Sequence, residues 1–169
     1  MRFTKKITIL AVAIFFTAFA GAQEKKAAAS PAATATGKIN GATITINYSS
    51  PFVKGRTIWG ELVPYGQVWR AGANAPTSFE TDKMLMVEGK ELPAGKYAVY
   101  VIPEKDEATI IFGKDPSIGA NKYDESKDQI RVKVKPKKSK AMTESLRYTV
   151  NKKDVTLSWE NLDFVMKIK

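Results

Sequence analysis

The residues best suited to chemistry gather in one stretch, "GRTIWGELVPYGQVWRAGANAPTSFETD", at positions 55–82. This stretch lacks the two-residue alternation of a half-buried strand and mixes aromatic rings with guanidinium, amide and hydroxyl groups. A ring offers an apolar face for stacking, while guanidinium and amide groups direct hydrogen bonds to hydroxyls or carboxylates. We therefore predict a site for a small molecule or glycan. Its residues are Trp69, Arg70, Asn74 and Thr77, with Tyr65 and Glu61 beside them.

The same residue types also suit a tight corner of the chain. Gly72 and Asn74 tolerate left-handed backbone, and a tryptophan in a β-sandwich is usually part of the core. Arg70 could be a buried arginine that pairs with a carboxylate and holds the corner together. The candidate partners are Glu61, Glu80 and Asp82. The structural and the binding interpretations are compatible if the corner forms the floor of a cleft.

Several reaction classes are excluded by composition. The chain contains no histidine and no cysteine. Ser-His-Asp and Cys-His nucleophilic systems are therefore absent, as are zinc sites built from those ligands. No glycine-rich phosphate-binding motif and no calcium-loop spacing occurs. The sequence predicts no cofactor, no metal site and no catalytic residue.

Carboxylate chemistry is the main enzymatic alternative. Two acids about 5–10 Å apart in a groove could hydrolyse a glycosidic bond. The candidate acids are Glu61, Glu80, Asp82, Glu160 and Asp163. We favour a non-enzymatic binding module over a glycan hydrolase because most acids of the chain have a plain structural role, in a charged loop or beside a turn.

The start of the chain predicts export. "MRFTKK" is basic, "ITILAVAIFFTAFA" is apolar over 14 residues, and "AFAGAQ" offers small residues for cleavage. This order is typical of a secretory signal peptide, and the apolar run is shorter than the roughly 20 residues of a spanning helix. We predict a signal peptide over residues 1–22 and a periplasmic or secreted protein. No later segment predicts a membrane span, and export makes nucleic acid an unsuitable partner.

The mature chain is expected to fold as one all-β domain. Residues 23–37 are rich in alanine, serine, threonine and proline, and predict a disordered tether. From residue 38 to 169, short alternating runs are separated by turn residues, as in "ATITINYSS" and "TIIFG". The run at 97–102 is apolar on both faces and predicts a central strand. We predict a single antiparallel β-sandwich, jelly-roll or immunoglobulin-like, of about 8–10 strands with little helix.

A basic run offers a second surface. Much of the net charge of +10 lies in "RVKVKPKKSK", at positions 131–140. Val132 and Val134 alternate with basic residues, as on a strand with one buried face. The run is either a solvated strand face or a contact for an anionic polymer. In the second case the domain could be a structural or interaction module of the cell envelope.

Two motifs resemble a known family. "YGQVWRAGAN" at 65–74 and "PAGKY" at 93–97 are similar to the hallmark of the bacterial domain of unknown function 2911. "YDESKDQIRVKVKP" and "LSWENLDFVMKI" resemble its later blocks, so the likeness covers residues 37–169. One loop departs from the pattern, because "SIGANKYD" lacks the Trp-Gly that often precedes Tyr-Asp in relatives, so the resemblance does not support a ligand role for this loop. The resemblance implies an exported, β-rich protein of the kind common among Bacteroidetes, and it implies no reaction.

Overall fold

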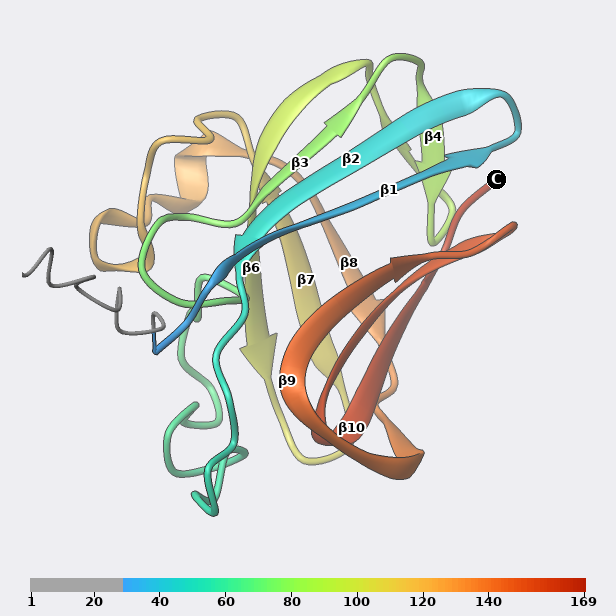
Figure 1. The fold of residues 1–169 in the computed structure, drawn as a ribbon. Helices are drawn as coiled ribbons and strands as arrows, with labels where there is room; N and C mark the ends of the chain where they lie inside the picture. Colours follow the sequence, from blue (N-terminus) through green and yellow to red (C-terminus); the bar gives the residue numbers. More distant parts are fainter. Residues whose placement is uncertain (1–28) are drawn as a thin grey trace, which may run out of the picture.

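A computed structural model describes residues 29–169 of the chain, which form ten β-strands and two short 3-10 turns (Figure 1). The strands are β1 (Ala32–Ile39), β2 (Ala42–Ser49), β3 (Ser78–Thr81), β4 (Leu85–Val87), β5 (Lys90–Leu92), β6 (Gly95–Pro103), β7 (Ala108–Gly113), β8 (Asp128–Val134), β9 (Lys137–Val150) and β10 (Asp154–Lys167). The turns are η1 (Ala120–Lys122) and η2 (Glu125–Lys127). The predicted signal peptide, residues 1–22, lies outside the described residues. Over residues 29–169 the structure has no helix with the length and apolar character of a membrane span.

The strands form antiparallel sheets, which confirms the predicted all-β sandwich. The large sheet has six strands in the order β1-β2-β3-β6-β7-β8. This is the order of the chain, apart from the β4–β5 hairpin inserted between β3 and β6, so the large sheet is a meander. The long β9–β10 hairpin curves across one face of this sheet (Figure 1).

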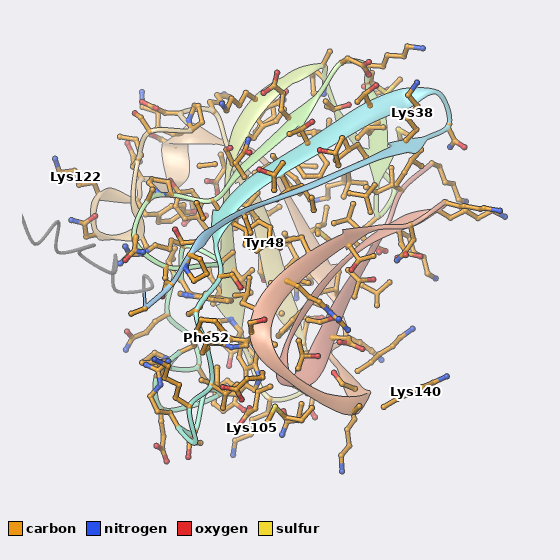
Figure 2. The ribbon with its side chains drawn as sticks, viewed as in Figure 1. Lys38, Tyr48, Phe52, Lys105, Lys122 and Lys140 are labelled. Atoms are coloured by element: carbon orange, nitrogen blue, oxygen red, sulfur yellow. The ribbon has the colours of Figure 1, made fainter. Side chains whose placement is uncertain are left out.

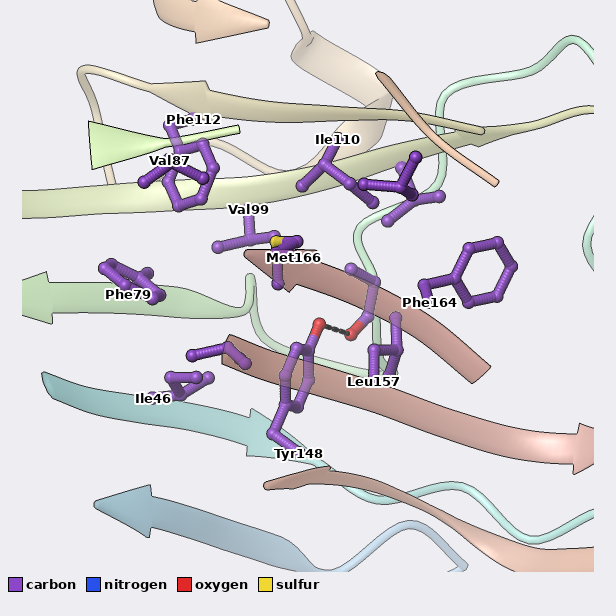
Figure 3. Close-up of a cluster of buried hydrophobic side chains, with 14 of the residues drawn as sticks. Ile46, Phe79, Val87, Val99, Ile110, Phe112, Tyr148, Leu157, Phe164 and Met166 are labelled. Atoms are coloured by element: carbon purple, nitrogen blue, oxygen red, sulfur yellow. Dashed lines mark hydrogen bonds between the residues drawn. The ribbon is translucent and has the colours of Figure 1, made fainter. Parts of the chain in front are cut away.

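One main hydrophobic core fills the space between the large sheet and the two hairpins. Ile46, Phe79 and Phe112 from the sheet meet Leu157 and Phe164 from β10 (Figure 3). The side chains of β2 alternate as predicted, with Ile44 and Ile46 fully buried. Burying each large aliphatic or aromatic side chain stabilises the fold by roughly 1.5–3 kcal/mol.

Strand β6 is central and buried on both faces, as its sequence predicts. Val99 and Val101 face the main core. On the opposite face, Ala98, Tyr100 and Ile111 form a smaller apolar cluster. The segment between β7 and β8, which contains η1 and η2, contributes Ala120 and Tyr123 to that cluster. The outer face of the sheet therefore carries a second, smaller packed region.

The predicted tether, residues 23–37, extends too far into the domain. Residues 32–37 belong to β1, which pairs with β2 from Ala32 opposite Ser49 to Ile39 opposite Ala42. Small half-buried residues alternate with exposed threonines along this strand. Gly37 sits so close to β9 that a Cβ there would lie 2.7 Å from Val150. Composition missed β1 because its stability comes from backbone pairing and close approach rather than from large apolar side chains.

Two alternating runs at the C-terminus form a single strand. "VTLSWEN" and "DFVMKIK" are joined in β10, which shifts register against β9 on both sides of Glu160. Glu160 has a positive φ of 53°. Such β-bulges bend a strand and increase its twist. They account for the curvature of the hairpin over the core.

Candidate functional site

The polar-aromatic segment is fixed along β6. Gly66 N donates to Pro103 O at 2.9 Å, and Trp69 exchanges two backbone hydrogen bonds of 2.8 Å with Val101. Val99 N then donates to Thr77 O at 2.9 Å. Residues 66–77 therefore continue the line of β3 beside β6, and residues 70–76 loop out from it.

The loop begins at Ala71, whose carbonyl is held inside the protein. Ala71 is fully buried and has a positive φ of 52°. Its carbonyl oxygen accepts from Thr77 Oγ1 at 3.1 Å and from Tyr148 OH at 2.8 Å. Tyr148 reaches this point through the main core, with its hydroxyl hydrogen-bonded (Figure 3). Burial raises the pKa of Tyr148, so its hydroxyl remains a donor.

Gly72 is required by close approach rather than by backbone angle. A Cβ at this position would lie 2.7 Å from Thr77 Oγ1 and 3.2 Å from Ser49 O. The Gly72 carbonyl accepts from Trp69 Nε1 at 3.0 Å. The glycine therefore lets the loop pack against β2 and also orients the Trp69 ring.

Arg70 and Asn74 hold the loop by hydrogen bonds on its solvent-exposed side. Asn74 has a positive φ of 53°, as its residue type allows. Its carbonyl accepts from Arg70 Nη1 at 2.6 Å, and its Nδ2 donates to Ser30 O at 3.2 Å. Each side chain uses only part of its hydrogen-bonding capacity in these contacts.

The proposed ion pair of Arg70 with a nearby carboxylate is wrong. Within residues 29–169 Arg70 makes no salt bridge. Glu80 pairs instead with Lys96 at 3.9 Å, and Asp82 Oδ1 accepts from Thr43 N at 2.7 Å. The corner is stabilised by hydroxyl and carbonyl hydrogen bonds, not by a buried ion pair.

All three tryptophans of the chain meet beneath this loop. Trp69 stacks on Trp159 of β10 with ring centroids 5.7 Å apart and an interplanar angle of 18°. Trp59 packs edge-on against both, at 5.8 Å from Trp69 and 6.1 Å from Trp159. Trp159 is buried and Trp69 is half-buried, so the cluster joins the core to the surface.

A cleft of about 590 Å³ opens over the tryptophan cluster. Trp69 and Trp159 line it together with Arg70 and Asn74. Lys54 and Arg56 add two further cations, and none of the lining residues is acidic. We call this feature the tryptophan cleft.

The cations of the tryptophan cleft bond to carbonyl groups or lie near an aromatic ring. Within residues 29–169, none of Lys54, Arg56 and Arg70 forms a salt bridge. Arg56 Nε donates to Val53 O at 3.0 Å, and its Nη2 donates to Phe52 O. Lys54 Nζ lies 5.7 Å from the centre of the Phe52 ring (Phe52 is labelled in Figure 2). The carboxylate of Glu144 lies nearby, but it accepts from the Lys54 backbone N–H. The cleft therefore attracts negative charge.

The structure brings together three of the predicted site residues and separates the others. Trp69, Arg70 and Asn74 line the tryptophan cleft. Thr77 is fully buried and holds the Ala71 carbonyl. Tyr65 and Glu61 are not among the residues that line the cleft. Tyr65 packs against the core, and a Cβ on Gly60 would lie 2.8 Å from its ring; Glu61 is exposed.

Among the lining residues that the predicted site left out are two cations and a tryptophan. Lys54 directly precedes the segment 55–82 and Arg56 is its second residue, so their charge was a signal within reach. Trp159 lies about ninety positions further along the chain, and no local pattern links it to Trp69. Only the packing of β10 against the loop brings the two rings together.

The acids named for a glycan hydrolase do not line the tryptophan cleft. Glu80 and Asp82 are engaged with Lys96 and Thr43, as described above. Asp163 accepts from Ser139 Oγ at 2.8 Å, and Glu160 occupies the bulge of β10. The cleft therefore lacks the facing carboxylates that this mechanism requires.

The sequence model of a family described as "Protein of unknown function (DUF2911)" matches residues 30–168. The chain belongs to this family. The match confirms the resemblance carried by "YGQVWRAGAN" and "PAGKY". It starts two residues before β1, in agreement with β1 being part of the DUF2911 domain. Comparison with curated proteins and with solved structures found no match.

Proposed function

We propose that this DUF2911 protein is a non-enzymatic binding module that acts after export on a small ligand, glycan or envelope component. The observation that carries the proposal is the tryptophan cleft, where three cations that form no ion pair within residues 29–169 line a cavity beside stacked indole rings. The ligand that suits this surface combines an anionic group with a sugar or aromatic ring.

The residues of the cleft suit both the anionic group and the ring of such a ligand. Charge-assisted hydrogen bonds from a guanidinium to a carboxylate contribute roughly 1.5–3 kcal/mol each. Arg70 keeps part of its donor set free for such bonds, since only Nη1 is engaged with Asn74. The Trp69 ring is half-buried and held by its bond to Gly72, so it can present a fixed apolar wall. The cleft volume lies within the roughly 300–1,000 Å³ of small-molecule sites.

Tryptophan fluorescence gives a direct test, because all three indoles lie at the cleft or against those that do. The protein is titrated with two acids, glucuronate and benzoate, and with their neutral counterparts, glucose and benzyl alcohol. We expect a saturable fluorescence change with at least one acid and a much weaker one with its counterpart. Equal responses to acid and counterpart, or none to either acid, would overturn the proposal.

Two variants assign the response to the cleft. Lys54→Gln removes a cation whose ammonium lies over the Phe52 ring and forms no ion pair within residues 29–169, and Arg70→Gln removes the guanidinium. We expect each to weaken binding of the acid by about tenfold or more, as loss of one charged hydrogen bond implies. Lys96→Gln, at the exposed start of β6, is the matched control and should leave the affinity unchanged.

A second candidate partner is an anionic polymer at the basic face. Lys133 pairs with Glu107 at 2.6 Å, and the lysines beyond it are exposed and form no ion pair within residues 29–169. Those lysines are Lys135, Lys137, Lys138 and Lys140. Figure 2 shows Lys140 projecting away from the β9–β10 hairpin. Binding to heparin that falls steeply with added salt, and that is lost when these four lysines become glutamine, would support this partner.

A further inference from the structure

A second cavity lies on the outer face of the large sheet, on the side opposite the main core. It has a volume of about 520 Å³ and shares no lining residue with the tryptophan cleft. Its floor is Tyr100 of β6, and its walls come from the segment 113–128 between β7 and β8. We call it the tyrosine pocket.

Two tyrosine rings form the fixed part of this pocket. Tyr100 and Tyr123 meet edge-to-face with centroids 5.1 Å apart. Tyr100 OH donates to Ile118 O at 2.6 Å. Tyr123 OH donates to Asp128 Oδ2 at 2.8 Å and accepts from Arg131 Nη2 at 2.9 Å. Because both hydroxyls are engaged, the rings are held in place. Tyr100 is buried and Tyr123 is half-buried, so Tyr123 presents the apolar surface of the pocket.

The charged residues around the rings are also held by local structure. Lys114 N donates to Lys127 O at 2.9 Å and closes the base of the segment. Asp115 Oδ1 accepts from the backbone and side chain of Ser117, and Asp124 Oδ1 does the same with Ser126. These bonds lower the pKa of both aspartates. Each carboxylate is therefore an ionised acceptor with its second oxygen available.

Asp128 adds an acceptor that the protein leaves unsatisfied. Its side chain is only 10% exposed, and Arg131 Nε lies 2.8 Å from Oδ2. Its Oδ1 atom is buried and accepts no hydrogen bond within residues 29–169. A buried acceptor without a donor costs about 1–3 kcal/mol. Asp128 also lines the pocket and adds a third carboxylate to its wall.

The charges of the tyrosine pocket are balanced, unlike those of the tryptophan cleft. Three lysines and three aspartates line it. These residues are Lys114, Lys122, Lys127, Asp115, Asp124 and Asp128. Because the lining charges cancel, neither an anionic nor a cationic ligand gains a net electrostatic attraction. A neutral ligand rich in hydroxyls can donate to the carboxylates, accept from the ammonium groups and pack against Tyr123.

We propose that the tyrosine pocket is a second binding site, specific for a neutral saccharide. Sugar hydroxyls bridge the aspartates and lysines, and one face of the sugar ring lies against the half-buried Tyr123. This site is independent of the tryptophan cleft in its residues, its charge and the face of the sheet that carries it.

The test follows amide signals of the isotope-labelled protein by NMR during titration with cellobiose, maltose and chitobiose. We expect at least one disaccharide to shift the amides of residues 113–128 in a saturable way, while the tryptophan indole N–H signals stay in place. Shifts confined to the tryptophan cleft, or no saturable shift with any of the three, would overturn the proposal. This titration does not use the acids that test the tryptophan cleft, so either binding proposal can be refuted without the other.

A matched pair of exposed aspartates tests the role of the carboxylates. Asp115→Asn keeps a side-chain oxygen for the bonds from Ser117 but removes the charge offered to the sugar. We expect it to weaken the disaccharide affinity several-fold. Asp106→Asn, in the β6–β7 loop away from the pocket, should leave the affinity unchanged. Equal affinities for the two variants would contradict direct hydrogen bonding by Asp115.

Discussion

The two hydroxyls that meet at the Ala71 carbonyl should stabilise the protein non-additively. Thr77→Val and Tyr148→Phe each remove one donor and preserve most of the side-chain volume. In each single variant the buried carbonyl keeps its other partner. We therefore expect each change to lower the free energy of unfolding by about 1 kcal/mol, the net value of one neutral hydrogen bond.

The double variant leaves that carbonyl with no hydroxyl donor. Ala71 is fully buried, so water cannot replace the missing partners without a rearrangement of the loop. An unsatisfied buried carbonyl costs a further 1–3 kcal/mol or so. We therefore expect the double variant to lose roughly 3–5 kcal/mol, which exceeds the sum of the single losses by about 1–3 kcal/mol.

Urea unfolding followed by tryptophan fluorescence measures these free energies, because the three indoles pack together next to this corner. Thr77→Ser combined with Tyr148→Phe is the control, since serine retains the hydroxyl, and its losses should add. A coupling energy below about 0.5 kcal/mol in the Thr77→Val cycle would refute the reasoning. In that case the Ala71 carbonyl finds water or another donor when both hydroxyls are removed.

Three other outcomes follow from single contacts. Gly72→Ala should lower the free energy of unfolding by about 1–3 kcal/mol, because the new Cβ would press on Thr77 Oγ1. If urea unfolding shows no loss beyond experimental error, the close contact at Gly72 is contradicted. Burial and Asp128 raise the pKa of Tyr123 from 10.0 to about 12, so the stability this group contributes is present below pH 10 and is lost as the pH rises toward 12. Tyr123→Phe should therefore reduce the fall in the free energy of unfolding between pH 10 and pH 12. An unchanged fall would contradict the raised pKa of Tyr123. The backbone N–H of Thr43 lowers the pKa of Asp82 below 3.8, so its contribution is present above that pH and is lost as the pH falls through the lowered value. The stability difference between the parent protein and Asp82→Asn should shrink in acid, and a constant difference down to low pH would contradict the assignment.

The sequence by itself determined the parts of the fold that depend on local pattern. Alternation specified β2, and apolar residues on both faces of β6 specified a central strand. The turn at Glu88-Gly89 was also predictable. Glu88 has a φ of 46° and Gly89 a φ of 83°, and glycine adopts a positive φ readily. These features are local because the side-chain period of a strand is two residues, whatever lies opposite.

Tertiary structure decided where the site lies and which residues complete it. Ser158 and Trp159 are consecutive and both buried, which breaks the alternation that sequence reasoning relies on. The register shift between Ser158 and Glu160 provides the reason, since a bulge re-aims the side chains around it. This bend places Trp159 against Trp69 and so creates the floor of the tryptophan cleft. A site assembled across two layers by an irregular strand has no counterpart in the local spacing of residues, and for that reason only the folded chain reveals it.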